Sequence, residues 1–298
     1  MHQLLKYALN LMIVLPFAAT AQQPLARLSE TEVEKLLFEV ALNAHPPLKF
    51  ASEGQTLGFF SSLSNNVFLP EGKGPYPAVV LVHHCGGVLQ YSRERAKDFL
   101  AAGFAVLILD SLSPRGQKTC RSGIVSSERV LKDAYDALAH LHTMQNIDSS
   151  RIYVTGGSLG SMTATWAASP EVAALMQSKY RFRASAGWYS NCVYRHAPNL
   201  PALRLLRKDI DKPVLLLMAG KDYEMPPEPD CTPLLKELTS QAKPVGWHLY
   251  PNAHHTWDSR EQDGHVWTNA FGVSTTYRYS EPITVDAMRR TIEFFNQH

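Results

Sequence analysis

The segment Gly156-Gly157-Ser158-Leu159-Gly160 carries the clearest chemical signal in the chain. It has the G-x-S-x-G pattern, in which a serine lies on a sharp turn between a strand and a helix. Glycines are needed beside such a serine because a Cβ atom there would collide with neighbouring backbone. An apolar run at residues 152–155 precedes the motif, and small residues follow it. The pattern predicts that Ser158 is a nucleophile at the end of a strand.

A serine hydroxyl attacks a carbonyl carbon when a histidine takes its proton and a carboxylate orients that histidine. Where the serine lies on such a turn, the acid and then the histidine follow it along the chain. Asp222 follows an apolar run at residues 214–218, and the adjacent His254 and His255 follow another at residues 247–250. We predict that Asp222 is the orienting acid and that one of the two histidines is the base. Three nearby acidic residues are alternatives to Asp222: Glu224, Glu228 and Asp230.

Such a reaction also needs two N–H donors for the oxyanion of its intermediate. The residue after the serine, Leu159, is predicted to supply one, and a loop after a neighbouring strand supplies the other. The segment His83-His84-Cys85-Gly86-Gly87 follows an apolar run that begins at residue 78, and we assign the second donor to Cys85. His84 in this loop, and Trp188 at the end of another apolar run, are predicted to contact the substrate.

Apolar runs alternate with helix-like segments from about residue 78 to the C-terminus. The runs are continuously apolar, which is typical of strands buried on both faces of a parallel sheet. We therefore predict an α/β fold, with a doubly wound, mostly parallel sheet flanked by helices. The candidate side chains follow its strands, and ligands of such sheets bind at the carboxyl ends of the strands. The connection after Trp188 holds about two dozen residues, which is too few for a large lid domain.

The N-terminal residues have the pattern of a secretory signal. An apolar stretch at residues 7–18 follows a single lysine and precedes the small-residue site Ala19-Thr20-Ala21. A membrane anchor is the alternative, but the stretch is shorter than the roughly 20 residues that span a bilayer. We predict a signal peptide at residues 1–21, a periplasmic or secreted product and no stable membrane insertion. Residues 22–298 then form one domain, with a helical extension at about residues 22–50.

The bulk composition is ordinary for a globular enzyme. We expect its partner to be a small-molecule ester substrate. Of the 298 residues, 45% are hydrophobic, and the net charge of +2 gives no indication of a nucleic-acid partner. No metal is expected, because the histidines and cysteines lack ligand spacing, and no cofactor is expected either. Four cysteines in an exported chain indicate disulfides, and the residues alone allow three complete pairings.

Six segments together resemble the dienelactone hydrolase family, from about residue 67 to residue 298. They lie at residues 77–87, 110–116, 156–160, 188–192, 219–222 and 250–258. The resemblance implies an α/β-hydrolase fold without a large lid and hydrolysis of small esters or lactones, and it places the base on His255. The founding enzymes use a cysteine nucleophile where this chain has Ser158, so lactone specificity does not transfer. Asn252 also replaces the usual glycine before Ala253.

The family often holds a substrate carboxylate with arginines, and Arg115 lies one position from the family's arginine. A structural role for Arg115 is the alternative, and Arg121 and Arg260 are further candidates. The resemblance also implies a disulfide between Cys192 and Cys231, which follow neighbouring strands in the usual strand order. By the same neighbour argument, Cys85 and Cys120 are a possible second pair.

The sequence thus predicts a serine hydrolase that cleaves small carboxylic esters or lactones through an acyl-enzyme. A peptidase or acyltransferase on the same fold is one alternative, because a fold does not fix a reaction. A non-catalytic binding protein that keeps the fold is the other.

Overall fold

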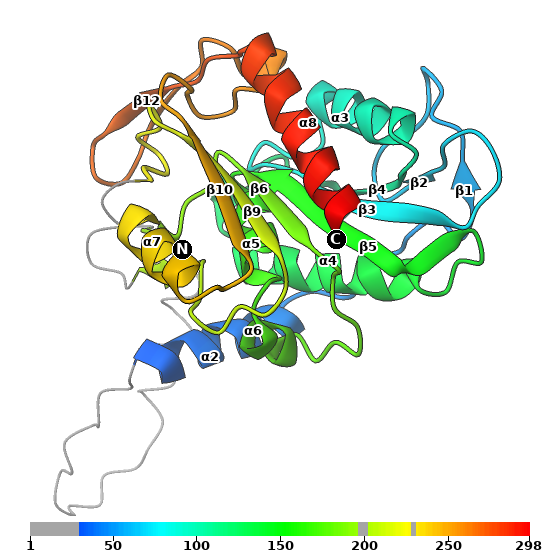
Figure 1. The fold of residues 1–298 in the computed structure, drawn as a ribbon, viewed down its shortest axis with the longest axis horizontal. Helices are drawn as coiled ribbons and strands as arrows, with labels where there is room; N and C mark the ends of the chain where they lie inside the picture. Colours follow the sequence, from blue (N-terminus) through cyan, green and yellow to red (C-terminus); the bar gives the residue numbers. More distant parts are fainter. Residues whose placement is uncertain (1–29, 196–201, 228–230) are drawn as a thin grey trace, which may run out of the picture.

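The computed structural model describes residues 30–195, 202–227 and 231–298. The predicted signal peptide lies outside the described residues. The described chain is built around one eight-stranded sheet with helices on both faces (Figure 1), which confirms the predicted fold class.

The sheet is parallel apart from one pair of strands. Its order is β1-β2-β4-β3-β5-β6-β9-β10, and among these pairs only β2 with β4 is antiparallel. Every residue of β4, β6 and β9 is buried, which explains the continuously apolar runs in the sequence. The strands are β1 (Gly54–Gln55), β2 (Val67–Phe68), β3 (Tyr76–Val82), β4 (Ala105–Leu109), β5 (Ile147–Gly157), β6 (Ser185–Trp188), β9 (Val214–Ala219) and β10 (Val245–Tyr250).

Helices cover the two faces of the sheet and form a separate apolar core on each. One face is covered by α4 (Ser127–Leu141) and α5 (Leu159–Trp166), and the other by α3 (Gln90–Ala101) and α8 (Glu281–Gln297) (Figure 1). The inward stripe of α4 that the helical period predicts is fully buried: Val130, Leu131, Ala134, Leu138 and Leu141. One residue, Ser158, separates the end of β5 from the start of α5.

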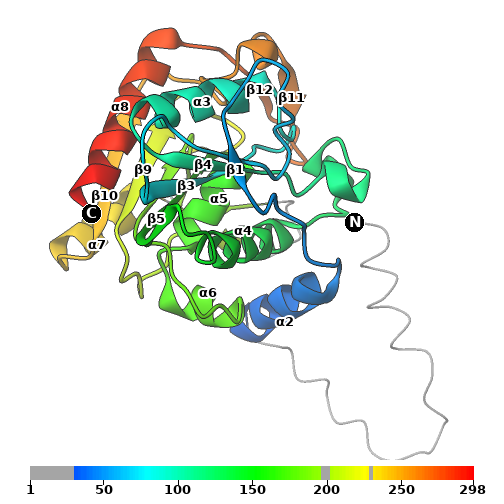
Figure 2. The same cartoon turned by 90° about the vertical axis from the view of Figure 1, so that its right-hand side faces the viewer.

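The N-terminal extension adds a helix, α2 (Glu30–Asn43), outside this first helical layer. Figure 2 shows α2 below α4 and beside α6 (Pro170–Leu175). Phe38 anchors it, because its ring is buried and lies edge-on to Trp166 with a centroid separation of 5.6 Å. The extension is therefore packed onto the domain through an aromatic contact.

Two short hairpins and one helix complete the described chain. Strand β7 (Val193–Tyr194) pairs with β8 (Leu203–Arg204), and β11 (Val266–Thr268) pairs with β12 (Ser274–Thr276). Helix α7 (Cys231–Ser240) packs beside β10. No large lid domain is found in the described segments, and none of the helices there is both long and apolar enough to span a membrane.

Candidate active site

Ser158 lies on a sharp turn between β5 and α5. Its backbone φ is +52°, a value that non-glycine residues rarely adopt, and its side chain is nearly buried. A Cβ atom on Gly156 would lie 2.3 Å from the Val82 carbonyl oxygen, and one on Gly160 would lie 2.5 Å from the same atom. The two glycines of the motif are therefore required by the close approach of β3, as the sequence pattern indicated.

The three residues predicted to act together are joined by hydrogen bonds. The Ser158 hydroxyl donates to His255 Nε2 at 3.0 Å, and His255 Nδ1 donates to Asp222 Oδ2 at 2.6 Å. Backbone N–H groups of Glu224 and Met225 both donate to Asp222 Oδ1 at 2.9 Å, which fixes the carboxylate. This chain of bonds can move a proton from a serine hydroxyl to an oriented imidazole.

The structure distinguishes the alternative base and the alternative acids from His255 and Asp222. His254 Nδ1 lies 3.0 Å from the Thr276 carbonyl oxygen at the end of β12, whereas His255 is the histidine that bonds Ser158. Glu224 lies 3.9 Å from His255 Nε2, on the opposite side of the ring from Asp222. Glu228 and Asp230 lie outside the described residues.

Burial alone would lower the pKa of His255, but the negative charges of Asp222 and Glu224 raise it by more. The net pKa of His255 therefore lies above its ordinary value of 6.5. A higher pKa makes the imidazole a stronger base. It also means that the ring is protonated, and so unable to accept a proton, up to a higher pH.

The predicted oxyanion donors flank Ser158. Leu159 is the first residue of α5, and N–H groups in the first turn of a helix have no partner within it. Cys85 lines the same cavity as Ser158, in the loop after β3. Their roles as donors stay predictions, and their positions suit that role.

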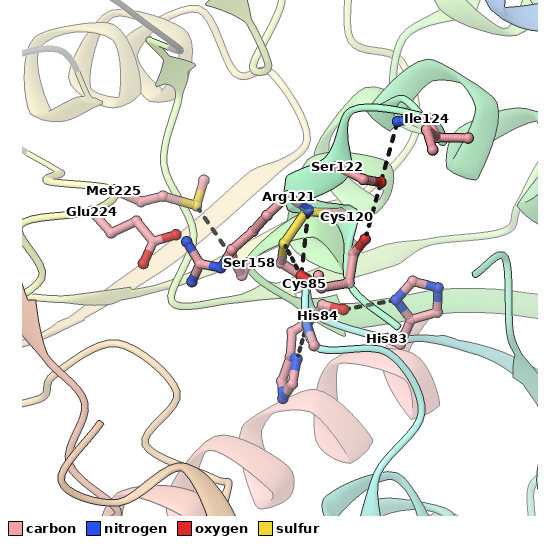
Figure 3. Close-up of a disulfide and its surroundings, with 12 residues drawn as sticks. His83, His84, Cys85, Cys120, Arg121, Ser122, Ile124, Ser158, Glu224 and Met225 are labelled. Atoms are coloured by element: carbon pink, nitrogen blue, oxygen red, sulfur yellow. Dashed lines mark hydrogen bonds between the residues drawn. A yellow bond between two sulfur atoms is a disulfide. The ribbon is translucent and has the colours of Figure 1, made fainter. Parts of the chain in front are cut away.

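Both disulfides weighed from the sequence are present. Cys85 is bonded to Cys120 with a Cα separation of 4.9 Å, and Cys192 is bonded to Cys231 with a Cα separation of 5.0 Å. The Cys120 N–H also donates to the Cys85 carbonyl oxygen at 2.9 Å. Figure 3 shows the Cys85–Cys120 bond beside Ser158. This disulfide therefore ties the predicted oxyanion loop to the 3₁₀ turn η2 (Cys120–Ser122).

The two disulfides allow a matched test of this positioning. Each closes a loop of similar length, so removing either pair is expected to lower the free energy of unfolding by about 3–4 kcal/mol. We expect the double variant Cys85→Ala/Cys120→Ala also to lose about 10- to 100-fold in kcat, because an oxyanion donor is no longer held. Cys192→Ala/Cys231→Ala should keep kcat. Equal kcat values in the two folded variants would show that the Cys85–Cys120 bond does not position the loop.

The substrate role expected for Arg115 is wrong. Its guanidinium donates to both carboxylate oxygens of Asp133, at 2.6 Å and 3.0 Å, and to the Ser111 carbonyl oxygen at 2.8 Å. Only 7% of the Arg115 side chain is exposed, and Asp133 on α4 is fully buried. Position after a strand predicts that a residue lies near the edge of the sheet, but not which way its side chain turns. Arg115 instead anchors the loop after β4 to α4.

Arg115→Ala is therefore expected to affect stability rather than substrate choice. Loss of the bonds to the buried carboxylate should lower the free energy of unfolding by about 1.5–3 kcal/mol, because Asp133 keeps only its partner Arg129. Arg115→Lys should recover part of this, since lysine lacks the planar fork. The measurement is urea unfolding, alongside kcat/KM for an anionic ester and its neutral methyl counterpart. A selective loss on the anionic ester would contradict the structural role.

The prediction for Trp188 is also wrong. The ring is 3% exposed, and its Nε1 donates to Thr291 Oγ1 on α8 at 2.9 Å. The side chain thus belongs to the core beneath α8, whereas the Trp188 carbonyl oxygen accepts the Ser158 N–H at 3.1 Å. Side chains alternate between the faces of a strand, and Trp188 points into the core.

His84, by contrast, lies on the wall of the cavity around Ser158. Its ring stacks on Tyr91 with a centroid separation of 4.3 Å, and Nδ1 accepts the Gly86 N–H at 2.9 Å. Burial lowers the pKa of His84 to about 3, so the ring is neutral. It can serve only as a neutral hydrogen-bonding or stacking surface.

The cavity that contains Ser158 has a volume of about 280 Å³. Most of its lining residues carry a polar group and none is aliphatic, yet more of its exposed wall is apolar than polar. The lining residues are His84, Cys85, Gly86, Thr119, Arg121, Ser158, Glu224, His255, Thr256, Gln262, His265 and Tyr277. Of the three arginines weighed from the sequence, Arg121 is the one that lines it. Its guanidinium lies 3.2 Å above the Trp267 ring centroid, and Nη2 donates to the Tyr277 hydroxyl at 3.1 Å.

Tyr277, His265 and Gln262 were not foreseen from the sequence. They lie in the segment from β10 to α8, which carries the β11–β12 hairpin across to the cavity. No motif marks them. The described residues contain no group of three or more histidine, cysteine or acidic side chains that could hold a metal ion.

Comparisons with known proteins identify the family and the fold. A model of the dienelactone hydrolase family matches residues 63–298. A Yersinia pestis protein assigned as a carboxymethylenebutenolidase is 24% identical over 241 residues, covering 76% of this chain and 79% of that protein.

Two solved structures share the fold. A dienelactone hydrolase from Klebsiella pneumoniae has a TM-score of 0.57 at 20% identity, covering 76% of this chain and 90% of that chain. Thermogutta terrifontis esterase 2, phosphonylated by cyclosarin, has a TM-score of 0.57 at 12% identity, covering 78% of this chain and 87% of that chain. Because the family model spans most of the sequence, the chain belongs to the dienelactone hydrolase family, and it is a carboxylic ester hydrolase.

Proposed function

We propose that this protein hydrolyses small carboxylic esters through an acyl-enzyme on Ser158. The observation that carries the proposal is the continuous bond chain from Ser158 through His255 to Asp222. Such a chain has one well-understood use, which is to activate a serine for attack on a carbonyl carbon.

In the first half of the reaction, Ser158 Oγ bonds to the ester carbonyl carbon while its proton passes to His255 Nε2. The N–H groups of Cys85 and Leu159 hold the resulting oxyanion. His255 then gives the proton to the leaving alcohol oxygen as the ester C–O bond breaks. In the second half, His255 takes a proton from the water that attacks the acyl carbon. The bond between Ser158 Oγ and the acyl carbon then breaks, Nε2 returns the proton to Oγ, and the acid is released.

The limited volume of the cavity, about 280 Å³, supports short esters over long-chain ones. A long fatty acyl chain would have to extend beyond it. The two disulfides support the predicted export, since disulfides persist in oxidising compartments. The proposed mature chain is residues 22–298 in the periplasm or outside the cell.

The test is a substrate panel on the mature protein. We expect p-nitrophenyl acetate and hydroxy-substituted short esters to be hydrolysed with far higher kcat/KM than p-nitrophenyl palmitate or peptide p-nitroanilides. Higher activity on the anilides would favour the peptidase alternative. Acyl transfer to an added alcohol in preference to water would favour the acyltransferase.

A further inference from the structure

Glu224 places a second carboxylate beside the reacting nitrogen of His255. Its Oε2 atom lies 3.9 Å from Nε2, the atom that accepts the Ser158 hydroxyl. Asp222 bonds the other ring nitrogen, Nδ1. Only 11% of the Glu224 side chain is exposed, so solvent screens its charge weakly. The imidazole of His255 therefore lies between two carboxylates.

The Glu224 carboxylate is held in place by neighbours from distant parts of the chain. The Tyr277 hydroxyl donates to Oε2 at 2.5 Å, and Arg121 Nη2 donates to that hydroxyl at 3.1 Å. The Glu224 backbone N–H donates to Asp222 Oδ1, so main chain and side chain are both fixed. In Figure 3, Glu224 and Arg121 point toward the space beside Ser158.

This placement removes hydration from a largely buried carboxylate, and the Tyr277 hydroxyl that donates to it is neutral. A negative charge at this distance from Nε2 favours a positive charge on the ring. The ring is positive only after Ser158 has released its proton, so the interaction strengthens during the reaction.

Resting on the serine mechanism proposed above, we infer that Glu224 is a second carboxylate partner of His255, which stabilises the imidazolium formed as Ser158 adds to the ester carbonyl. In that step the Oγ–carbon bond forms, the Ser158 proton moves to Nε2, and the carbonyl π pair becomes the oxyanion. When the ester C–O bond breaks, the oxyanion pair re-forms the carbonyl and Nε2 returns the proton to the leaving oxygen. Glu224 takes no proton in either step.

Several charged or titratable groups face His255 from different elements. They are Asp222 and Glu224 after β9, Arg121 in η2, His84 after β3, Tyr189 after β6 and Tyr277 after β12. Burial holds His84 neutral and raises the pKa of both tyrosines, so these three stay uncharged at neutral pH. Arg121 lowers the pKa of His255, whereas the two carboxylates raise it. Removing the negative charge of Glu224 is therefore expected to lower the pKa of His255.

The experiment measures kcat/KM for p-nitrophenyl acetate from pH 5 to pH 9 with Glu224→Gln. At pH 8 we expect a loss of about tenfold, the equivalent of one pKa unit of lost stabilisation. The acidic limb of the profile should move about one pH unit lower, because a carboxylate near His255 has been removed. The loss should therefore shrink as the pH falls.

Three further variants separate charge from structure, and a fourth serves as the control. Glu224→Asp and Tyr277→Phe keep the negative charge and should keep the acidic limb where it is in the wild type. Glu224→Met, a second neutral variant, should move the limb as Glu224→Gln does. Glu237→Gln, an exposed change on α7, should match the wild type throughout.

An equal loss at every pH with an unmoved limb, in folded Glu224→Gln or Glu224→Met, would overturn the inference and leave the serine mechanism intact. Full activity in a Ser158→Ala variant would instead overturn the proposed function itself. The two failures are thus distinct.

Discussion

Ser158→Ala is expected to lower kcat for short esters about 10⁴- to 10⁶-fold, because the members of such a triad act as a unit. The alanine variant cannot form the acyl-enzyme, and His255 loses the hydroxyl from which it takes a proton. The residual rate should come from water attack within the oxyanion site. Stability should change little, since one small hydroxyl is removed from a cavity wall.

Ser178→Ala is a suitable control, because Ser178 lies in the connection before β6, at the opposite edge of the sheet from the carboxyl ends. Its kcat should equal that of the wild type. If Ser158→Ala retained near-full esterase activity, the nucleophile would have to be sought elsewhere.

His255→Ala is expected to be nearly as damaging as Ser158→Ala, whereas His254→Ala should cost far less. His255 bonds both Ser158 and Asp222, while His254 bonds the Thr276 carbonyl oxygen at the end of β12. The two variants remove the same atoms from adjacent positions, so each controls for the other. A greater loss of kcat in His254→Ala would mean that the base has been assigned one residue too late.

The pH profile of the wild type should follow from the same geometry. His255 must be neutral to act, and its pKa lies above 6.5 because Asp222 and Glu224 outweigh the effect of burial. Activity is therefore expected to be full above that pKa and to fall as the pH drops through it. A rate that stayed constant from pH 8 to pH 5 would be incompatible with a histidine base.

Local pattern and chain order predicted Ser158 and Asp222, whereas the family resemblance placed the base on His255 rather than His254. The turn around Ser158 needs glycines wherever it occurs, and the order of serine, acid and histidine follows from a sheet that brings strand ends together. Strand ends alone did not determine side-chain direction. Arg115 and Trp188 both follow or end strands, yet one turns to Asp133 and the other to Thr291.

The contacts among Tyr277, Glu224 and Arg121 in the cavity wall could not be predicted from the sequence for a different reason. Tyr277 meets Glu224 across 53 residues and Arg121 across 156 residues of chain. These contacts depend on where the β11–β12 hairpin packs, and no short sequence motif predicts that position. Glu224 appeared only as an alternative to Asp222, because both are carboxylates in one loop and only the structure separates the two sides of the imidazole.

The most direct measurement is the reaction of the mature protein with a fluorophosphonate probe, followed by mass spectrometry of its peptides. An activated serine attacks the phosphorus, displaces fluoride and keeps the adduct. We expect one adduct per chain, on Ser158, formed in step with the loss of esterase activity and absent from Ser158→Ala and His255→Ala. A protein that hydrolyses esters while Ser158 stays unmodified, or that carries the adduct on another residue, would contradict the assignment of Ser158 as the nucleophile.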